Sequence, residues 1–190
     1  MRKFNLAVVI PLSIMSCSAV ASYSDSSLEL GVSAGQFNLK DSTGSYSGPS
    51  VGFNFIRNFN DWFSFEGNYL SSFNMDNANY DIQASTFSLA PVFTYHINDT
   101  FSIYGKGGAS SMRITSSERN GLDFSYNTIG WFYGFGLNTS INNRINVRLG
   151  YETVTGDTGI EILGVTADGF SIQSSHTKIS VISLGATYRF

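Results

Sequence analysis

Beyond Ser27 the chain alternates between apolar and polar residues with a period of two, the signature of β-strands with two unlike faces. The segment 145–152 shows this most clearly, because every odd position is a large apolar residue and every even position is polar or glycine. Seven other segments repeat the pattern, beginning at Leu28, Val51, Phe63, Phe87, Phe101, Ile129 and Ile182. Phe132 breaks it by standing on the otherwise polar face of its segment.

The connections between these eight segments alternate in length. Three are short and rich in Asn and Asp, as tight turns require: 57–61, 98–100 and 142–144. Four are longer and polar: 40–48, 71–81, 113–123 and 155–175. Short periplasmic turns and long extracellular loops are typical of outer-membrane barrels. The pattern therefore predicts an all-β protein, an eight-stranded antiparallel up-and-down transmembrane β-barrel with its loops exposed outside a Gram-negative cell.

A secreted soluble β-sandwich or lipocalin-like barrel would also alternate, so the character of the two faces decides between the classes. Here one face carries the large apolar residues, while the other offers mostly Gly, Ser and Asn with few charges for contact with water. Only 13% of the residues are charged and 15% are aromatic, which favours a chain that faces lipid. Past the N-terminus no apolar run approaches the roughly 18 residues of a membrane helix, so we expect the chain to cross as strands.

The N-terminus has the layout of a secretory signal peptide. Arg2 and Lys3 precede an apolar stretch over 6–15, and small residues alternate up to Ala21. We predict cleavage between Ala21 and Ser22, which divides the chain into a signal peptide over 1–21 and a mature barrel domain over 22–190.

Cleavage at this point would remove Cys17, the chain's one cysteine. The alternative is lipidation of Cys17, but Met15 fits a lipoprotein signal badly. The mature chain would carry nine basic residues against 14 acidic ones, a formal charge of −5. This balance argues against nucleic acid as a partner.

Three stretches resemble the Ail/OmpX family of small outer-membrane barrels. They are the Ile-Asn-Asp turn at 97–99 with the following 102–105, the Tyr-Gly-Phe-Gly-Leu run at 133–137, and the ending over 184–190. The resemblance implies a barrel embedded in outer-membrane lipid, in a family that includes adhesins, invasins and serum-resistance factors. It also implies that Tyr188 and Phe190 belong to the terminal signal that the barrel assembly machinery reads, although an aromatic anchor on the last strand would have the same residues.

Five charged residues fall on the face predicted to line the lumen: Glu66, Lys106, Arg148, Glu152 and Arg189. An eight-stranded barrel is filled by side chains, and unpaired buried charges cost several kcal/mol. We therefore predict a paired structural network, with an ion path gated by these pairs as the alternative.

Catalysis on such a barrel would need a histidine near a serine or an acid. His96 falls near a short turn and His176 near the last long loop, so the two histidines are predicted to lie at opposite ends. We expect no enzyme activity, no cofactor and no metal site. A lipid-modifying enzyme and a narrow channel remain the alternatives to an interaction protein.

The long connection 155–175 is unusually apolar for a loop. Its candidate contact residues are Ile160, Ile162, Leu163 and Phe170. Acidic residues dominate the four long connections, which suits a host or cell-surface protein partner better than a sulfated glycan. The alternative is that the flanking strands simply continue past the membrane.

Overall fold

The computed structural model describes residues 27–41, 44–73, 75–77, 80–118, 123–158, 165–166, 169–170 and 175–190. The strands are β1 Leu28–Asp41, β2 Gly44–Asn58, β3 Phe63–Ser72, β4 Met75–Asn77, β5 Tyr80–His96, β6 Phe101–Glu118, β7 Asp123–Ser140, β8 Ile145–Thr158, β9 Val165–Thr166, β10 Gly169–Phe170 and β11 Ser175–Arg189. No helix in the described part of the chain has the length and hydropathy needed to cross a membrane.

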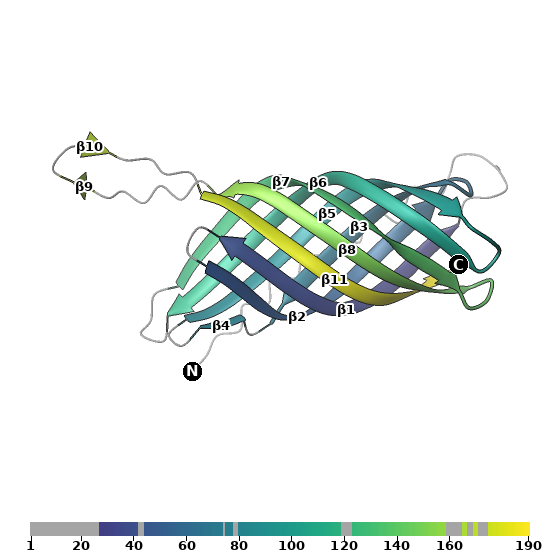
Figure 1. Ribbon diagram of the computed structural model, residues 1–190, viewed down its shortest axis with the longest axis horizontal. Helices are drawn as coiled ribbons and strands as arrows, with labels where there is room; N and C mark the ends of the chain where they lie inside the picture. Colours follow the sequence, from purple (N-terminus) through teal and green to yellow (C-terminus); the bar gives the residue numbers. More distant parts are fainter. Residues whose placement is uncertain are drawn as a thin grey trace.

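Eight long strands pair antiparallel with their neighbours and form a closed barrel, which confirms the predicted fold class (Figure 1). The first and last strands close it, in a register that runs from Glu29 opposite Arg189 to Lys40 opposite Lys178. The short β4 adds to β5, and β9 and β10 pair only with each other. Closure gives each of the eight long strands a partner on both sides, as a bilayer requires.

The three short turns share one local structure, and we call the end of the barrel that holds them the short-turn end. In each turn an asparagine Oδ1 accepts hydrogen bonds from the backbone N–H groups two and three residues later. Asn60 accepts from Trp62 and Phe63 at 3.1 and 2.8 Å, and Asn98 and Asn142 repeat this geometry. These asparagines satisfy backbone donors inside the turn, so each hairpin closes through its own sequence.

At the opposite end, which we call the hairpin end, the strands run further than the sequence suggested. Most of the connections predicted at 40–48 and 113–123 are strand, because β1 and β2 pair up to Asp41 and Gly44, and β6 and β7 pair up to Ser117 and Asp123. The connection 71–81 contains β4, and β8 and β11 shorten 155–175 from both sides. Cross-strand pairing satisfies the backbone more completely than an open loop, so polar sequence alone did not mark the strand ends.

The alternation found in the sequence separates an outward face from the lumen. Apolar side chains on the outward face are well exposed, as at Phe135 (59%), Leu149 (48%) and Leu184 (58%). Their immediate neighbours Gly134, Arg148 and Gly150 are buried or face inward. A protein in water would bury this apolar face, so the arrangement is that of a lipid-facing barrel.

Candidate functional site

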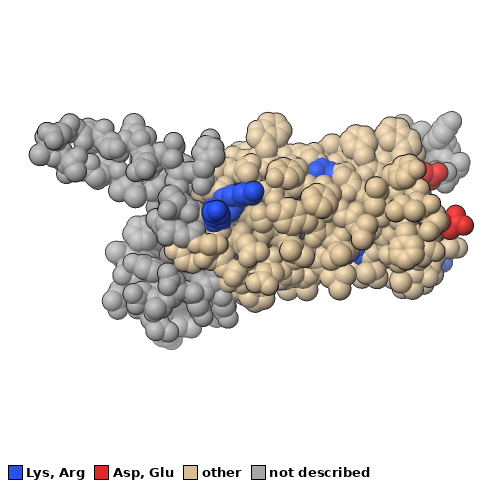
Figure 2. Space-filling view, viewed as in Figure 1, with Lys and Arg blue, Asp and Glu red and all other residues tan. Residues whose placement is uncertain are grey.

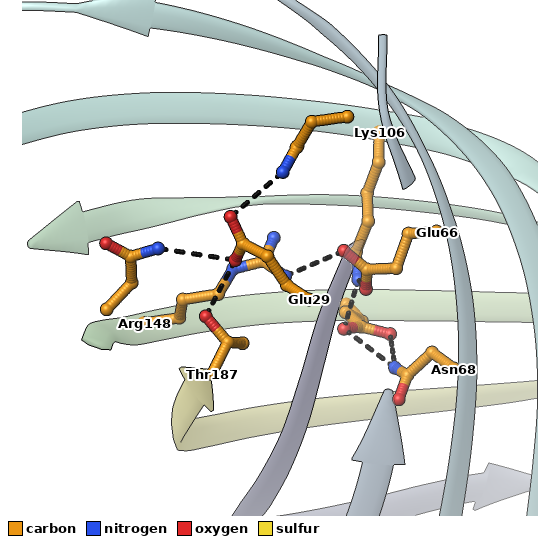
Figure 3. A network of polar contacts seen from close by, with 9 residues as sticks. Glu29, Glu66, Asn68, Lys106, Arg148 and Thr187 are labelled. Carbon is orange, nitrogen blue, oxygen red and sulfur yellow. Dashed lines mark hydrogen bonds and ion pairs between the residues drawn. The ribbon is translucent and has the colours of Figure 1, made fainter. Parts of the chain in front are cut away.

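Four charged side chains meet inside the barrel and form one central ion network (Figure 3). The Lys106 Nζ atom lies 2.5 Å from Oε1 of Glu66 and 2.6 Å from Oε1 of Glu152. Arg148 donates from Nη1 to Oε2 of Glu66 at 2.8 Å. Asn68 donates from Nδ2 to both oxygens of Glu152 at 3.2 and 3.1 Å. Two acids and two bases balance one another, which is what allows these charges to remain buried.

Glycines of the Tyr-Gly-Phe-Gly-Leu run make room for this network. Lys106, Gly134 and Glu152 occupy one rung of three neighbouring strands, with Gly134 in the middle. A Cβ atom at Gly134 would lie 3.2 Å from Cε of Lys106 and 3.0 Å from Cγ of Glu152. Gly134 therefore lets the two side chains meet across β7.

The structure separates Arg189 from the central network, which corrects the sequence-based grouping. Arg189 instead pairs with Glu29, its register partner on β1, through Nη2 at 2.8 Å. Glu29 also accepts bonds from Thr187 at 2.8 Å and Asn58 at 2.9 Å. Arg189 is the last residue of β11 and lies at the mouth of the barrel, where its side chain is 44% exposed.

A polar vestibule opens at the short-turn end and extends inward to Arg148. Its volume is about 530 Å³, and Glu29, His96, Arg148 and Arg189 are among its lining residues. The guanidinium carbon of Arg148 lies 4.3 Å from the ring centre of Tyr104, so these two side chains stack at its inner end. A second cavity of only about 20 Å³ lies within the ion network. The polar interior therefore narrows sharply beyond Tyr104.

Toward the hairpin end the lumen is closed by a second, apolar layer. We call these buried side chains the apolar plug: Phe37, Leu39, Leu70, Ala84, Ala90, Met112, Phe132, Val154, Ile179 and Val181. Phe132, the exception in the sequence pattern, belongs to this plug and is 4% exposed. Its ring centre lies 5.9 Å from the Lys106 Nζ atom, so the plug begins directly beside the ion network.

The outward face carries an apolar groove of about 750 Å³ across β5 to β8. Phe93, Ile103 and Phe135 are among its lining residues, and at its centre a Cβ atom on Gly105 would have no neighbour within 4 Å. Aromatic side chains gather at the short-turn end, where Trp62 stacks on Phe93 at 6.1 Å. This distribution matches a wall in contact with acyl chains, with aromatic residues near the interface.

The remaining predicted residues have the following places. Tyr188 and Phe190 lie at the end of the barrel wall, with ring centres 4.9 Å apart, and the Phe190 N–H donates to the Leu28 carbonyl at 2.9 Å. Phe170 belongs to β10, outside the barrel sheet. Ile160, Ile162, Leu163 and the predicted cleavage site at Ala21 and Ser22 lie outside the described residues.

The two histidines lie far apart along the barrel. His96 ends β5 and lines the vestibule, whereas His176 is the second residue of β11 at the hairpin end. Among the described residues no group of three or more His, Cys, Asp or Glu could hold a metal ion. His96 and His176 therefore do not share a site.

Sequence reasoning missed Glu29, Asn68 and the apolar plug. A signal for the plug does exist, because Phe37 and Leu39 stand on the face opposite to Val32 and Ala34 of the same strand. Apolar residues therefore move from the outward to the inward face of β1 near its end, and the sequence shows this change.

The closed sheet, apolar outer wall and filled polar interior define an integral β-barrel of a bacterial outer membrane. The family profile described as "Outer membrane protein beta-barrel domain" matches residues 7–190, and the chain belongs to this family. The chain also has the fold of solved Ail, a member of the Ail/OmpX group that the three sequence stretches resemble.

Solved structures show the same fold at low sequence identity. Neisserial surface protein A shares 16% identity with a TM-score of 0.71, covering 87% of this chain and 99% of that one. The attachment invasion locus protein Ail of Yersinia pestis, in complex with the heparin analogue sucrose octasulfate, shares 20% with a TM-score of 0.58 and coverages of 87% and 99%. OprG from Pseudomonas aeruginosa shares 12% with a TM-score of 0.53 and coverages of 87% and 95%. No curated protein sequence matches the chain.

Proposed function

We propose that this protein is a surface interaction protein, in which a rigid barrel holds the hairpin end outside the cell for contact with a protein partner. The observation that carries the proposal is the double closure of the lumen by the central ion network and the apolar plug. With the lumen filled and the outer wall committed to lipid, the hairpin end is the surface left for recognition.

The proposed orientation rests on the contrast between the two ends. Short turns face the periplasm in outer-membrane barrels, and here they are the three asparagine turns. The end of the β1–β11 seam at which Glu29 pairs with Arg189 would then face the periplasm, close to the barrel assembly machinery that we propose reads Tyr188 and Phe190. A cysteine placed at Asn143 should be protected from a membrane-impermeant maleimide on intact cells, whereas one at residue 120 should react.

The chemistry of the hairpin end favours a protein as the partner. In the sequence of the longest connection, apolar Ile160, Ile162, Leu163 and Phe170 stand among acidic residues that include Asp157 and Glu161. Protein interfaces use an apolar centre within a polar rim, whereas acids repel sulfated sugars. We therefore propose that this barrel differs in ligand from Ail, whose structure holds a heparin analogue.

A narrow channel is the second candidate, because the vestibule of about 530 Å³ opens at the short-turn end. Conduction would require the ion network and the plug to open together. Planar bilayer recordings test this directly, and steady single-channel steps from the wild type would favour the channel.

The position of His96 and His176 at opposite ends supports a binding role over a lipid-modifying enzyme, and unaltered lipid A in overexpressing cells is the expected result.

The decisive experiment shortens one hairpin without disturbing the barrel. Thr158 and Ser175 are register partners, so an Asn-Gly turn can replace residues 159–174. A control variant carries the same turn in place of residues 118–122, between the register partners Ser117 and Asp123. Cells expressing each form are assayed for adhesion to epithelial layers and for survival in serum, after heat-modifiable mobility shows that the barrel has folded. We expect the wild type and the control to be active in one of these assays and the 159–174 variant to lose that activity. Full retention by the latter would overturn the role of this hairpin.

A further inference from the structure

The vestibule at the short-turn end is enclosed by the whole barrel wall. Each of the eight long strands contributes at least one residue to its lining, and Tyr104 and Arg148 stack at its inner end. Its volume of about 530 Å³ falls within the range of small-molecule sites, roughly 300–1,000 Å³. The vestibule therefore has the size and the enclosure of a binding site for a small solute, which the proposed role of the hairpin end does not use.

The charged groups of the vestibule are already engaged in ion pairs. Arg148 at the inner end donates to Glu66 at 2.8 Å, and Arg189 pairs with Glu29 at 2.8 Å. A charged solute would have to compete with these pairs, and taking one partner away from a buried pair is strongly destabilising. An uncharged solute leaves both pairs intact.

The lining's other acid and its histidine lie at the rim. Asp61 and His96 are both exposed. Figure 2 shows acidic side chains at this end of the molecule, beyond a broad wall with little charge. Exposed charges are solvated and screened by salt, so they contribute little to a solute held at the inner end.

The inner wall offers uncharged hydrogen-bonding groups. Ser64, Thr94 and Asn138 line the vestibule from three different strands. The Asn138 Oδ1 atom is buried and accepts no hydrogen bond from any residue in the described part of the chain. Asn138 is the register partner of Arg148, so its amide lies beside the inner end. An unpaired buried acceptor is costly, and turning the amide toward the vestibule would let a hydroxyl of a bound solute donate to it.

We infer that the vestibule binds an uncharged sugar or polyol. A hydroxyl group both donates and accepts hydrogen bonds, so one such solute can serve Asn138 and the hydroxyl side chains of the wall together. The C–H groups of a sugar ring suit the apolar part of the lining, which Ile56 and Val92 provide. In the proposed orientation the solute is a periplasmic one, and the inference uses that orientation for nothing else.

Three sugars that share a ring but differ in charge test the inference: glucose, cationic glucosamine and anionic glucuronate. The folded barrel is held in dodecylphosphocholine micelles, which contain no sugar and leave both ends of the barrel open, and each sugar is titrated by saturation-transfer NMR. We expect glucose to bind roughly tenfold more tightly than either charged sugar, because only glucose leaves the ion pairs undisturbed. A preference for glucuronate would show an anion site at the arginines, and a preference for glucosamine would show a cation site. Either preference would overturn the inference, as would a titration in which no sugar binds and the vestibule holds water only.

The variants Asn138→Ala and Asn54→Ala locate the site. Both asparagines have a buried Oδ1 atom without a hydrogen bond in the described part of the chain, but Asn54 lines the small cavity of the ion network and not the vestibule. Asn138→Ala should weaken glucose binding about fivefold, equivalent to ~1 kcal/mol for one hydrogen bond, whereas Asn54→Ala should leave it unchanged. Heat-modifiable mobility shows that both variants fold. Equal effects of the two substitutions would overturn the assignment to the vestibule, and failure of the hairpin exchange in the adhesion assays would leave this measurement unchanged.

Discussion

Lys106 and Glu152 meet at 2.6 Å in the barrel interior although an entire strand lies between them. They can do so because Gly134, their shared neighbour on β7, has no side chain. The geometry explains why a glycine belongs at this position of an otherwise aromatic strand. It also ties the stability of the barrel to one buried ion pair.

Removal of Lys106 should be severely destabilising. Lys106→Met leaves the Glu152 carboxylate without a cation, so the free energy of unfolding in lipid should fall by about 3–5 kcal/mol. Adding Glu152→Gln should recover much of that loss, and more than Glu66→Gln does, because Glu66 keeps Arg148 as a partner. Urea titrations of the four forms give the coupling energy, and strictly additive effects would show that the pair does not act as a unit.

Gly134→Ala should weaken the same pair by crowding. Its Cβ would approach the Lys106 and Glu152 side chains to 3.2 and 3.0 Å, closer than ordinary van der Waals contact, and overpacking of this kind typically costs about 1–3 kcal/mol. Gly107→Ala is the control, since its nearest neighbour would be 3.5 Å away. An equal unfolding midpoint for the two variants would mean that the interior yields easily at Gly134.

The apolar plug should contribute to stability as an ordinary protein core does. Phe132→Ala removes a buried ring and should cost about 3–5 kcal/mol. Phe135→Ala lies three residues along the same strand but faces outward, where lipid fills the vacated space, so a smaller loss is expected. The two unfolding free energies in vesicles of one composition provide the check, and the reverse order would contradict the inward placement of Phe132.

A charge on the outward wall should obstruct insertion. Leu149→Arg places a guanidinium on the lipid-facing wall, at a cost of about 2–4 kcal/mol near the membrane centre. Asn143→Arg adds the same charge to the exposed turn of the same hairpin and should be nearly neutral. Folding yields in vesicles, read from heat-modifiable mobility, should differ clearly between the two, and matching yields would count against the assigned lipid face.

The fold could be predicted because a barrel strand displays its two environments at alternate positions. The segment 145–152 shows the apolar and the polar face within eight residues, and each asparagine turn can likewise be recognised from a few neighbouring residues. The grouping of charges could be predicted only in part. Alternation predicts that the side chains of Arg148 and Arg189 point into the lumen. Their positions along the barrel axis depend on the stagger between strands, which the local sequence does not reveal, so the two arginines could not be assigned to different networks.

The plug escaped prediction for a related reason. The sequence pattern treats one strand face as uniform along its length, whereas the lumen changes from polar to apolar beyond Lys106. Phe132 was recognised as an exception, but the same change at Phe37 and Leu39 was not. Ile160, Ile162 and Leu163 lie outside the described residues, so their role in recognition stays a prediction.

The seam between β1 and β11 has opposite electrostatics at its two ends. Glu29 and Arg189 attract each other at the short-turn end, while Lys40 and Lys178 repel each other at the other. Since the seam joins the first strand to the last, its pairing is the step that completes the barrel. The charge pattern favours pairing that starts at Glu29 and Arg189 and proceeds toward Lys40 and Lys178. Because Lys40 and Lys178 repel each other, the hairpin end of this seam should be its weaker end, where fraying begins.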